Sequence, residues 1–320
     1  MTPRVHLVTA FQARGGSQER ALQLRAVLGR HADAELWSST SVHPDYRARG
    51  IRRIFPALGR FPRGGNLVFV GTAPIGLWVK AAFPRRVVLV HNTFNAVTLH
   101  RRLRRLRGPL LPRPEVVFCS PLVERSAGVA GTVQLSPIDL ARFRPATPDA
   151  SRPFTVGRLS RDTAIKFGHE DGELFRSLAA DGVRVRLMGG TCLAPELAGA
   201  PGVELLPMGT EDAPGFLGSV DCLVYRTAAH WPEPFGRVVA EAMACGLPVV
   251  CHRSGGYAEL LVAHGRTGFL FGSNEEAVAI VRRLRHDPAL RARVGAEARR
   301  HVERLYGAEE EERIRRFYCS

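Results

Sequence analysis

The sequence predicts an α/β protein built from two doubly wound parallel sheets, and three observations support that fold class. Short apolar runs alternate with longer amphipathic segments along almost the whole chain, which is the pattern of repeated strand–helix units. A Pro-, Ala- and Arg-rich stretch at residues 140–153 interrupts the alternation, which then restarts. The chain has 320 residues, enough for two domains of ordinary size.

The N-terminal half opens with a strand at 5–11, a turn containing Gly15 and Gly16, and a helix at 17–30. The glycines allow a ligand or another backbone to approach closely, although the turn lacks the G-x-G-x-x-G pattern. Residues 46–63 are basic and rich in turn formers. Further strands are expected at 34–38, 66–71, 86–91, 115–120 and 132–135. Helices are expected at 74–83, at 96–107 and from 121 onward.

The C-terminal half repeats the same alternation. Its strands are expected at 154–156, 183–188, 203–206, 222–225, 248–251 and 267–271. Its helices are expected at 171–181, 195–200, 213–219, within the apolar run before Gly246, at 277–284 and at 289–306. The acidic and basic residues at 309–316 predict a solvated helix. We therefore place one domain at 1–145, a second at 146–305 and a helical tail at 306–320.

The most informative stretch runs from Glu233 through Pro-Phe-Gly to Glu241 and on to Val250. Its first carboxylate precedes a predicted helix and its second lies inside that helix, which Gly246 ends. Free N–H groups and the dipole at a helix N-terminus attract phosphate oxygens, and carboxylates accept hydrogen bonds from sugar hydroxyls. The stretch therefore predicts a binding site for a phosphorylated sugar compound.

Several glycines and polar residues follow the predicted strand ends, where ligands of doubly wound sheets bind. They are Gly15, Gly16, His91, Gly157, Arg158, Gly189, Gly190 and Glu233. Because they come from both halves of the chain, we expect a site in a cleft between the two domains.

Composition restricts the class of protein. No apolar run is long enough for a membrane span, and no signal peptide is recognisable. The six cysteines are scattered, which predicts free thiols and a cytoplasmic protein. The formal net charge is +15, and Lys80 and Lys166 are the two lysines in the sequence. This excess is compatible with anionic membranes, nucleic acid or phosphorylated substrates.

Several motifs together carry a family resemblance. They are Ser136–Pro145 with its Pro-Ile-Asp start, Gly157-Arg158-Leu159-Ser160 with Lys166, Val185–Gly190, Glu233–Val250, Ser254–Glu259 and Gly265–Leu270. They cover most of residues 136–271 and resemble the retaining glycosyltransferases of family 4, within glycosyltransferase group 1. The resemblance implies the GT-B architecture, in which two Rossmann-like domains face each other across a cleft. Domain 1–145 would lie on the acceptor side, and 146–305 would bind the nucleotide sugar.

The resemblance also implies roles for individual residues. Arg158 and Lys166 would hold the donor diphosphate, because fixed cations stabilise a departing nucleoside diphosphate. Glu233 would face the hydroxyls of the transferred sugar, and Glu241 would bind the ribose. His91 would lie near the transferred sugar. The further donor contacts that it implies are Gly15, Gly16, Gly157, Gly189, Gly190, Pro234, Phe235, Gly236 and Glu259.

Simpler interpretations stand beside these roles. Glu259 is equally suited to capping a helix N-terminus, and a polar residue such as His91 after a strand is often a turn former. The spacing from Arg158 to Lys166 is longer than the family's usual spacing.

The predicted reaction is metal-independent, hexosyltransferase-like transfer from a nucleotide sugar to a glycan, a lipid-linked acceptor or a small molecule. No D-x-D metal motif is evident, so we expect no metal and no further cofactor. Two alternatives are a GT-B sugar-nucleotide epimerase and, from another class, a basic nucleic-acid-binding protein, which no recognition motif supports. The arginines at 47–63 and 101–107 suit either peripheral contact with the anionic inner membrane face or solvated surfaces.

Overall fold

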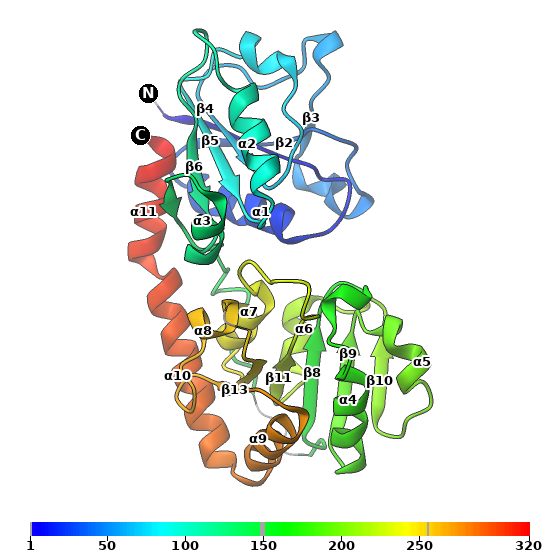
Figure 1. The fold of residues 1–320 in the computed structure, drawn as a ribbon. Helices are drawn as coiled ribbons and strands as arrows, with labels where there is room; N and C mark the ends of the chain where they lie inside the picture. The colour runs from blue at the N-terminus through cyan, green and yellow to red at the C-terminus, as the bar shows by residue number, and fades with distance from the viewer. Residues whose placement is uncertain (1, 148–150, 255) are drawn as a thin grey trace. The chain divides into compact units, whose positions relative to one another are not determined.

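The computed structural model describes residues 2–147, 151–254 and 256–320 (Figure 1). The chain forms two compact units. Unit 1 runs to Pro137 and also contains Ala308–Ser320, and unit 2 is Ile138–Gly307. The predicted linker residues 148–150 and the predicted motif residue Gly255 lie outside the described residues.

Unit 1 contains a parallel sheet whose order is β3-β2-β1-β4-β5-β6-β7. Its strands are β1 (Arg4–Thr9), β2 (Asp33–Ser38), β3 (Arg52–Arg53), β4 (Asn66–Val70), β5 (Arg86–His91), β6 (Glu115–Phe118) and β7 (Thr132–Val133). Its α-helices are α1 (Gly16–Leu28), α2 (Ala96–Arg105), α3 (Pro121–Ala127) and α11 (Ala308–Cys319). Short 3₁₀ helices occur at η1 (Pro44–Arg49), η2 (Pro56–Leu58) and η3 (Leu77–Ala81).

Unit 2 contains a second parallel sheet whose order is β10-β9-β8-β11-β12-β13. Its strands are β8 (Thr155–Leu159), β9 (Arg184–Met188), β10 (Val203–Leu206), β11 (Cys222–Tyr225), β12 (Val249–His252) and β13 (Phe269–Phe271). Its α-helices are α4 (Asp171–Ala180), α5 (Ala194–Leu197), α6 (Ala213–Gly218), α7 (Arg237–Ala244), α8 (Tyr257–Leu261), α9 (Asn274–His286) and α10 (Pro288–Tyr306). The 3₁₀ turns are η4 (Ala164–Lys166) and η5 (Thr191–Leu193).

The strand orders confirm the predicted doubly wound class. In each sheet the chain adds strands on one side of the first strand, then returns to its other side, so that β1 pairs with both β2 and β4, and β8 with both β9 and β11. The order therefore reverses between β1 and β4 in unit 1 and between β8 and β11 in unit 2. Ligands of doubly wound sheets bind at the carboxyl ends of the strands at such a reversal.

The predicted helix at 74–83 is shorter than expected. The structure has only the 3₁₀ helix η3 there. Gly76 precedes it and Pro84 follows it, which leaves too few residues for an α-helix with satisfied ends.

The predicted C-terminal helix is present as α11, but it is solvated on one face only. Ile314 and Tyr318 are buried in the core of unit 1, together with Leu24 and Leu28 of α1. Tyr318 donates its hydroxyl proton to Gln134 Oε1 at 3.0 Å, and its carbonyl accepts from Asn66 Nδ2 at 2.9 Å. The apolar residues occupy one face of a helix whose other positions are charged, so the charged residues dominate the sequence pattern.

The two units divide earlier than the boundary that the sequence analysis placed at 145. The segment after Pro137 packs within unit 2, where Phe143 is buried. Arg299 of α10 donates from Nη1 to the Phe143 carbonyl at 2.7 Å. A Cβ on Gly246 would lie 3.2 Å from Pro145 Cγ, so this segment also lies against the end of α7.

No helix among the described residues is long and apolar enough to cross a membrane.

The burial of α11 predicts that Ile314→Ala destabilises unit 1 by about 2–5 kcal/mol, because it leaves a cavity in the core. Tryptophan fluorescence during urea unfolding reports this, since the buried Trp37 and Trp78 lie in unit 1. The control Leu260→Ala truncates a side chain that is 39% exposed in unit 2 and should leave that transition unchanged. Equal midpoints for Ile314→Ala and the parent protein would contradict the packing of α11.

Candidate functional site

The carboxyl ends of β8 and β11 bring three side chains of unit 2 together. Lys166 Nζ contacts Glu233 Oε2, and the Tyr225 hydroxyl donates to the same oxygen at 3.1 Å. The Lys166 and Glu233 side chains are only 11% and 14% exposed. Two residues that the sequence analysis assigned to the donor site therefore form an ion pair at the strand-order reversal.

The surroundings of this ion pair affect its protonation. Burial lowers the pKa of Lys166, and the neighbouring Glu233 carboxylate opposes that shift. Burial raises the pKa of Tyr225, so its hydroxyl stays protonated and donates to Glu233. Tyr225 was missed by the sequence analysis, because a tyrosine in a buried strand resembles an ordinary core residue.

Arg158 lies beneath the ion pair and has no exposed surface. Its guanidinium donates to three carbonyls: those of Leu159 at 3.0 Å, Lys166 at 2.5 Å and Arg226 at 2.8 Å. The guanidinium carbon lies 3.8 Å from the centre of the Tyr225 ring, a cation–π contact. Arg158 thus holds the backbone of the loops after β8 and β11, and its contact with the donor diphosphate stays a prediction.

Arg226 follows β11 directly and was also missed by the sequence analysis. It is buried, and its Nε donates to Asp171 Oδ1 at 2.7 Å while Nη1 contacts Glu170 Oε2 at 3.1 Å. Asp171 in turn accepts from the Gly168 N–H at 2.8 Å. This network connects the start of α4 to the carboxyl end of β11.

The motif from Glu233 to Glu241 forms a tight turn followed by α7. Gly236 is the N-cap, with φ +73°, and a Cβ there would lie 2.4 Å from the Tyr257 ring. Only glycine fits that position without strain. Phe235 is buried beside it, and Pro234 is half-buried.

Glu241 lies on the buried side of α7, with 8% of its surface exposed. Its Oε1 is 2.7 Å from Arg237 Nε, one turn earlier on the helix. Burial of a carboxylate is costly unless it is paired, and Arg237 supplies that pairing. The predicted ribose contact of Glu241 would therefore share the carboxylate with Arg237.

Three predicted donor-contact glycines have packing roles. Gly189 has φ +78°, and a Cβ there would lie 1.9 Å from the Ser160 carbonyl oxygen. A Cβ on Gly157 would meet Val220 at 2.8 Å, and one on Gly190 would meet Leu187 at 2.7 Å. These close approaches explain glycine at each position, and the donor contacts stay predictions.

Glu259 caps its own helix. Its carboxylate accepts from the Ser254 N–H at 3.1 Å and the Gly256 N–H at 2.8 Å, at the start of α8. This geometry matches the capping interpretation of the sequence, and a donor contact stays a prediction.

Unit 1 has its own polar cluster at the carboxyl edge of its sheet. His91 ends β5 and is 1% exposed. Burial lowers the pKa of His91 to about 4, and the charge of Arg102 adds to the shift. His91 is therefore a neutral imidazole at pH 7.

Arg102 is the least expected member of this cluster. It lies on α2, where the spacing from Leu99 to Arg102 to Leu106 gives it an inward position that the sequence pattern could have revealed. Its Nη1 donates to the Gly71 carbonyl at 2.5 Å, and burial lowers its pKa to about 10.

The glycine turn lies at the start of α1. Gly15 is the N-cap of α1, and Gly16 is exposed with open space where a Cβ would lie. Ser17 accepts from Asn92 Nδ2 at 2.9 Å, which connects this turn to the residue after His91. The structure therefore joins Gly16 and His91 through Ser17 and Asn92 in unit 1.

Comparison with known structures identifies the fold. Anabaena HepE in complex with UDP-glucose aligns with a TM-score of 0.75 at 16% identity, covering 98% of this chain and 99% of that one. WaaG, a glycosyltransferase of lipopolysaccharide biosynthesis, aligns with a TM-score of 0.66 at 14% identity, covering 99% and 100%. The fold is GT-B. The two Rossmann-like sheets predicted from the sequence are those of this architecture.

The sequence of unit 2 is similar to that of known glycosyltransferases. Residues 196–301 match the family model of the glycosyl transferases group 1, which includes the stretch from Glu233 to Val250. A D-inositol 3-phosphate glycosyltransferase of Rhodococcus opacus is 32% identical over 52% of this chain. The sulfoquinovosyl transferase of Arabidopsis thaliana is 43% identical over 22%. The matches span 42% and 15% of those proteins, so the chain matches less than half the length of either.

The role of Arg158 as an internal support gives a prediction that needs no ligand. Arg158→Met should destabilise unit 2 by at least about 1–3 kcal/mol, the cost of one buried acceptor that loses its donor. Hydrogen exchange of the amides in β8 and β11, without any nucleotide present, measures the effect. The matched control Arg161→Met removes an exposed guanidinium from the same loop and should leave exchange unchanged. Identical exchange in both variants would contradict the support that Arg158 gives to the loops after β8 and β11.

Proposed function

We propose that this chain is a glycosyltransferase that moves a sugar from a nucleoside diphosphate sugar to an acceptor hydroxyl. The observation that carries the proposal is the Lys166–Glu233–Tyr225 cluster at the carboxyl edge of the unit 2 sheet. A cation and a carboxylate next to the N-terminus of α7 are the groups that a sugar diphosphate requires. The group 1 family match includes Tyr225, Glu233 and α7, although not Lys166, and supports the same activity.

A bound donor would replace the contact between Lys166 and Glu233 with its own contacts to each of them. Lys166 and Glu233 neutralise each other as an ion pair. A bound donor would offer its diphosphate to Lys166 and its sugar hydroxyls to Glu233, so each charge would keep a partner. Arg158 would position Lys166 through its hydrogen bond to the Lys166 carbonyl. The fixed ammonium would then stabilise the negative charge that develops on the departing diphosphate.

The remaining parts of the donor would contact the helix that follows. The N-terminal N–H groups of α7 would face phosphate or sugar oxygens, and Glu241 would accept hydrogen bonds from the ribose while keeping Arg237 as its second partner. His91, as a neutral imidazole, would contact the transferred sugar as a hydrogen-bonding group. We also propose that the transferred sugar keeps its anomeric configuration, as in the retaining glycosyltransferases of family 4.

Relatives guide the choice of substrates to test. HepE was crystallised with UDP-glucose and with UDP, so UDP-sugars are the first donors to try. Names of the relatives include a D-inositol 3-phosphate glycosyltransferase and a probable sucrose-phosphate synthase of Thermosipho melanesiensis. Phosphorylated small molecules therefore join glycans and lipid-linked saccharides as candidate acceptors.

A thermal-shift panel of UDP-, GDP- and ADP-sugars tests donor binding. We expect one nucleotide to raise the unfolding temperature, because a ligand that binds only the folded state stabilises it. Donor turnover in the presence of acceptor candidates then tests transfer. Release of an epimerised donor without acceptor would instead support an epimerase.

Two substitutions test the assigned contacts. Glu241→Ala should weaken binding of the nucleoside diphosphate about 10- to 100-fold, since a hydrogen bond to a charged group contributes about 1.5–3 kcal/mol. Lys166→Ala should weaken it by a similar factor. Calorimetric titration with the nucleotide from the panel measures both. Glu173→Ala, an exposed carboxylate on α4, is the control and should bind normally. Normal affinity in Glu241→Ala would remove the ribose contact from the proposal.

Metal removal tests the proposed chemistry. Lys166 and the α7 N-terminus would supply the positive charge that a divalent ion supplies in metal-dependent transferases. Transfer should therefore proceed at an unchanged rate in EDTA. A loss of activity that manganese restores would refute metal independence.

A further inference from the structure

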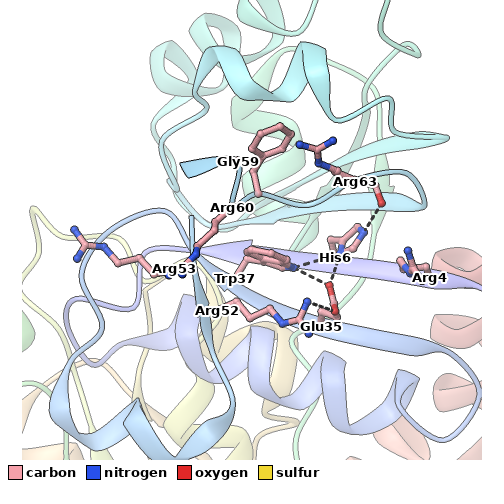
Figure 2. A pocket seen from close by; sticks show the side chains of 10 residues that line it. Arg4, His6, Glu35, Trp37, Arg52, Arg53, Gly59, Arg60 and Arg63 are labelled. Carbon is pink, nitrogen blue, oxygen red and sulfur yellow. Dashed lines mark hydrogen bonds and ion pairs between the residues drawn. The ribbon is translucent and has the colours of Figure 1, made fainter. Parts of the chain in front are cut away.

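A second basic site lies in unit 1, in a cavity of about 730 Å³ shown in Figure 2. Strands β1, β2 and β3 and the loop that leads to β4 supply its walls. Its charged lining residues are Arg4, Arg52, Arg53, Arg60, Arg63 and Glu35. Five arginines and one glutamate give this lining a strongly positive charge.

The floor of the cavity consists of polar side chains of β1 and β2 that contact one another. His6 and Trp37 are 2% and 6% exposed, and the Trp37 indole N–H donates to Glu35 Oε2 at 3.1 Å. His6 Nδ1 lies 3.0 Å from the same carboxylate oxygen. Glu35 Oε2 therefore has two partners in the floor, as dashed lines in Figure 2 show.

The loop that carries Arg60 and Arg63 is attached at both ends. Phe55 and Arg60 exchange backbone hydrogen bonds of 2.7 and 3.2 Å, which close the loop around η2. The Arg63 carbonyl lies 3.2 Å from His6 Nε2. The Arg63 guanidinium carbon lies 4.7 Å from the centre of the Phe61 ring. The two arginines are thus presented by a closed loop.

The charges around this cavity are not balanced. Arg52 Nη1 contacts Glu35 Oε1 at 2.6 Å, and Arg4 pairs with Asp33 at 3.2 Å. Within the described chain, Arg53, Arg60 and Arg63 have no carboxylate within ion-pair distance. Like charges around one cavity repel each other, and an anion that enters would relieve that repulsion.

We propose that this cavity binds a phosphate ester. A guanidinium presents paired N–H groups that match phosphate oxygens, and a phosphomonoester carries about −1.5 to −2 charge, which suits several arginines. The volume exceeds that of a phosphoryl group alone and is in the range of sites for small organic molecules. The half-buried Phe61 ring offers apolar surface to the organic part.

This site is separate from the cluster around His91. His6 is level with Leu67 in the sheet, whereas Val70 pairs with Val90, the residue before His91. The floor therefore lies about four residues, or about 13 Å, back along the strand direction from His91. The proposal does not rest on the glycosyltransferase activity, because it depends only on unit 1 residues outside the predicted donor contacts.

The phosphate ester has two sources, a soluble metabolite or a lipid headgroup. Phe55 and Leu58, on the loop beside the cavity, are 43% and 63% exposed, and these side chains would suit the apolar part of a lipid surface. Glycerol 3-phosphate represents the soluble source, and phosphatidylcholine vesicles that contain phosphatidic acid represent the lipid source. Glycerol and pure phosphatidylcholine vesicles are the uncharged controls.

The test compares two double variants of the full chain with the same loss of charge. Arg60→Gln with Arg63→Gln removes two cavity arginines, and Arg113→Gln with Arg125→Gln removes two exposed arginines elsewhere in unit 1. Calorimetry measures glycerol 3-phosphate binding, and co-sedimentation measures vesicle binding. We expect the cavity variant to lose at least about tenfold in affinity for one of the two probes, and the control variant to retain it.

The pattern of results identifies the source. Loss confined to glycerol 3-phosphate supports a soluble ligand, and loss confined to phosphatidic acid vesicles supports a headgroup. Equal losses in both variants would show that net charge alone attracts the probes and would overturn the proposal. Absence of binding by the parent chain to either probe would overturn it too. Binding of the nucleotide sugar to the cavity variant is measured separately. Its result tests the proposed glycosyltransferase function and is independent of the result for the cavity.

Discussion

The buried guanidinium of Arg158 is the interaction on which the candidate donor site depends. Its hydrogen bonds join the end of β8, the turn that carries Lys166 and the residue after β11. The first two segments are close in the sequence, whereas Arg226 lies 68 residues after Arg158, so the guanidinium connects two separate βα loops. Because the bonds are charge-assisted and enclosed, they hold Lys166 close to Glu233 before any ligand arrives. Preorganisation of this kind lowers the cost of binding a diphosphate.

Charge and burial are arranged differently in the two units. In unit 2 the charges at the carboxyl edge are paired with each other: Lys166 with Glu233, Arg226 with Asp171, and Arg237 with Glu241. In unit 1 the basic residues have fewer carboxylates near them, both at buried Arg102 and around the cavity at Trp37. An anionic ligand would therefore compete with internal carboxylates in unit 2, whereas in unit 1 it would meet arginines that still lack a counter-charge.

Sequence patterns predicted the strands better than the direction of single polar or aromatic side chains. Most strands and the doubly wound class followed from apolar runs and their alternation with helices, because a buried parallel strand needs a continuous apolar segment. The candidate donor residues followed from motif resemblance, and the structure brings Lys166 and Glu233 into contact. Tyr225, Arg226 and Arg102 were missed, because a single polar or aromatic residue in an apolar segment does not show which way it points. The C-terminal helix was misjudged because its many charges mask the buried face formed by Ile314 and Tyr318.

The sequence by itself determined the fold class, the two successive sheets and the stretch around Glu233, since each depends on local periodicity or on neighbours along the chain. Only the tertiary structure decided which charges meet. It placed Lys166 against Glu233, enclosed Arg158 among three carbonyls, joined α11 to unit 1 and gathered five arginines around one cavity. These arrangements depend on packing between residues distant in sequence. Burial and distance set the strength of a charge interaction, and neither can be read from spacing along the chain.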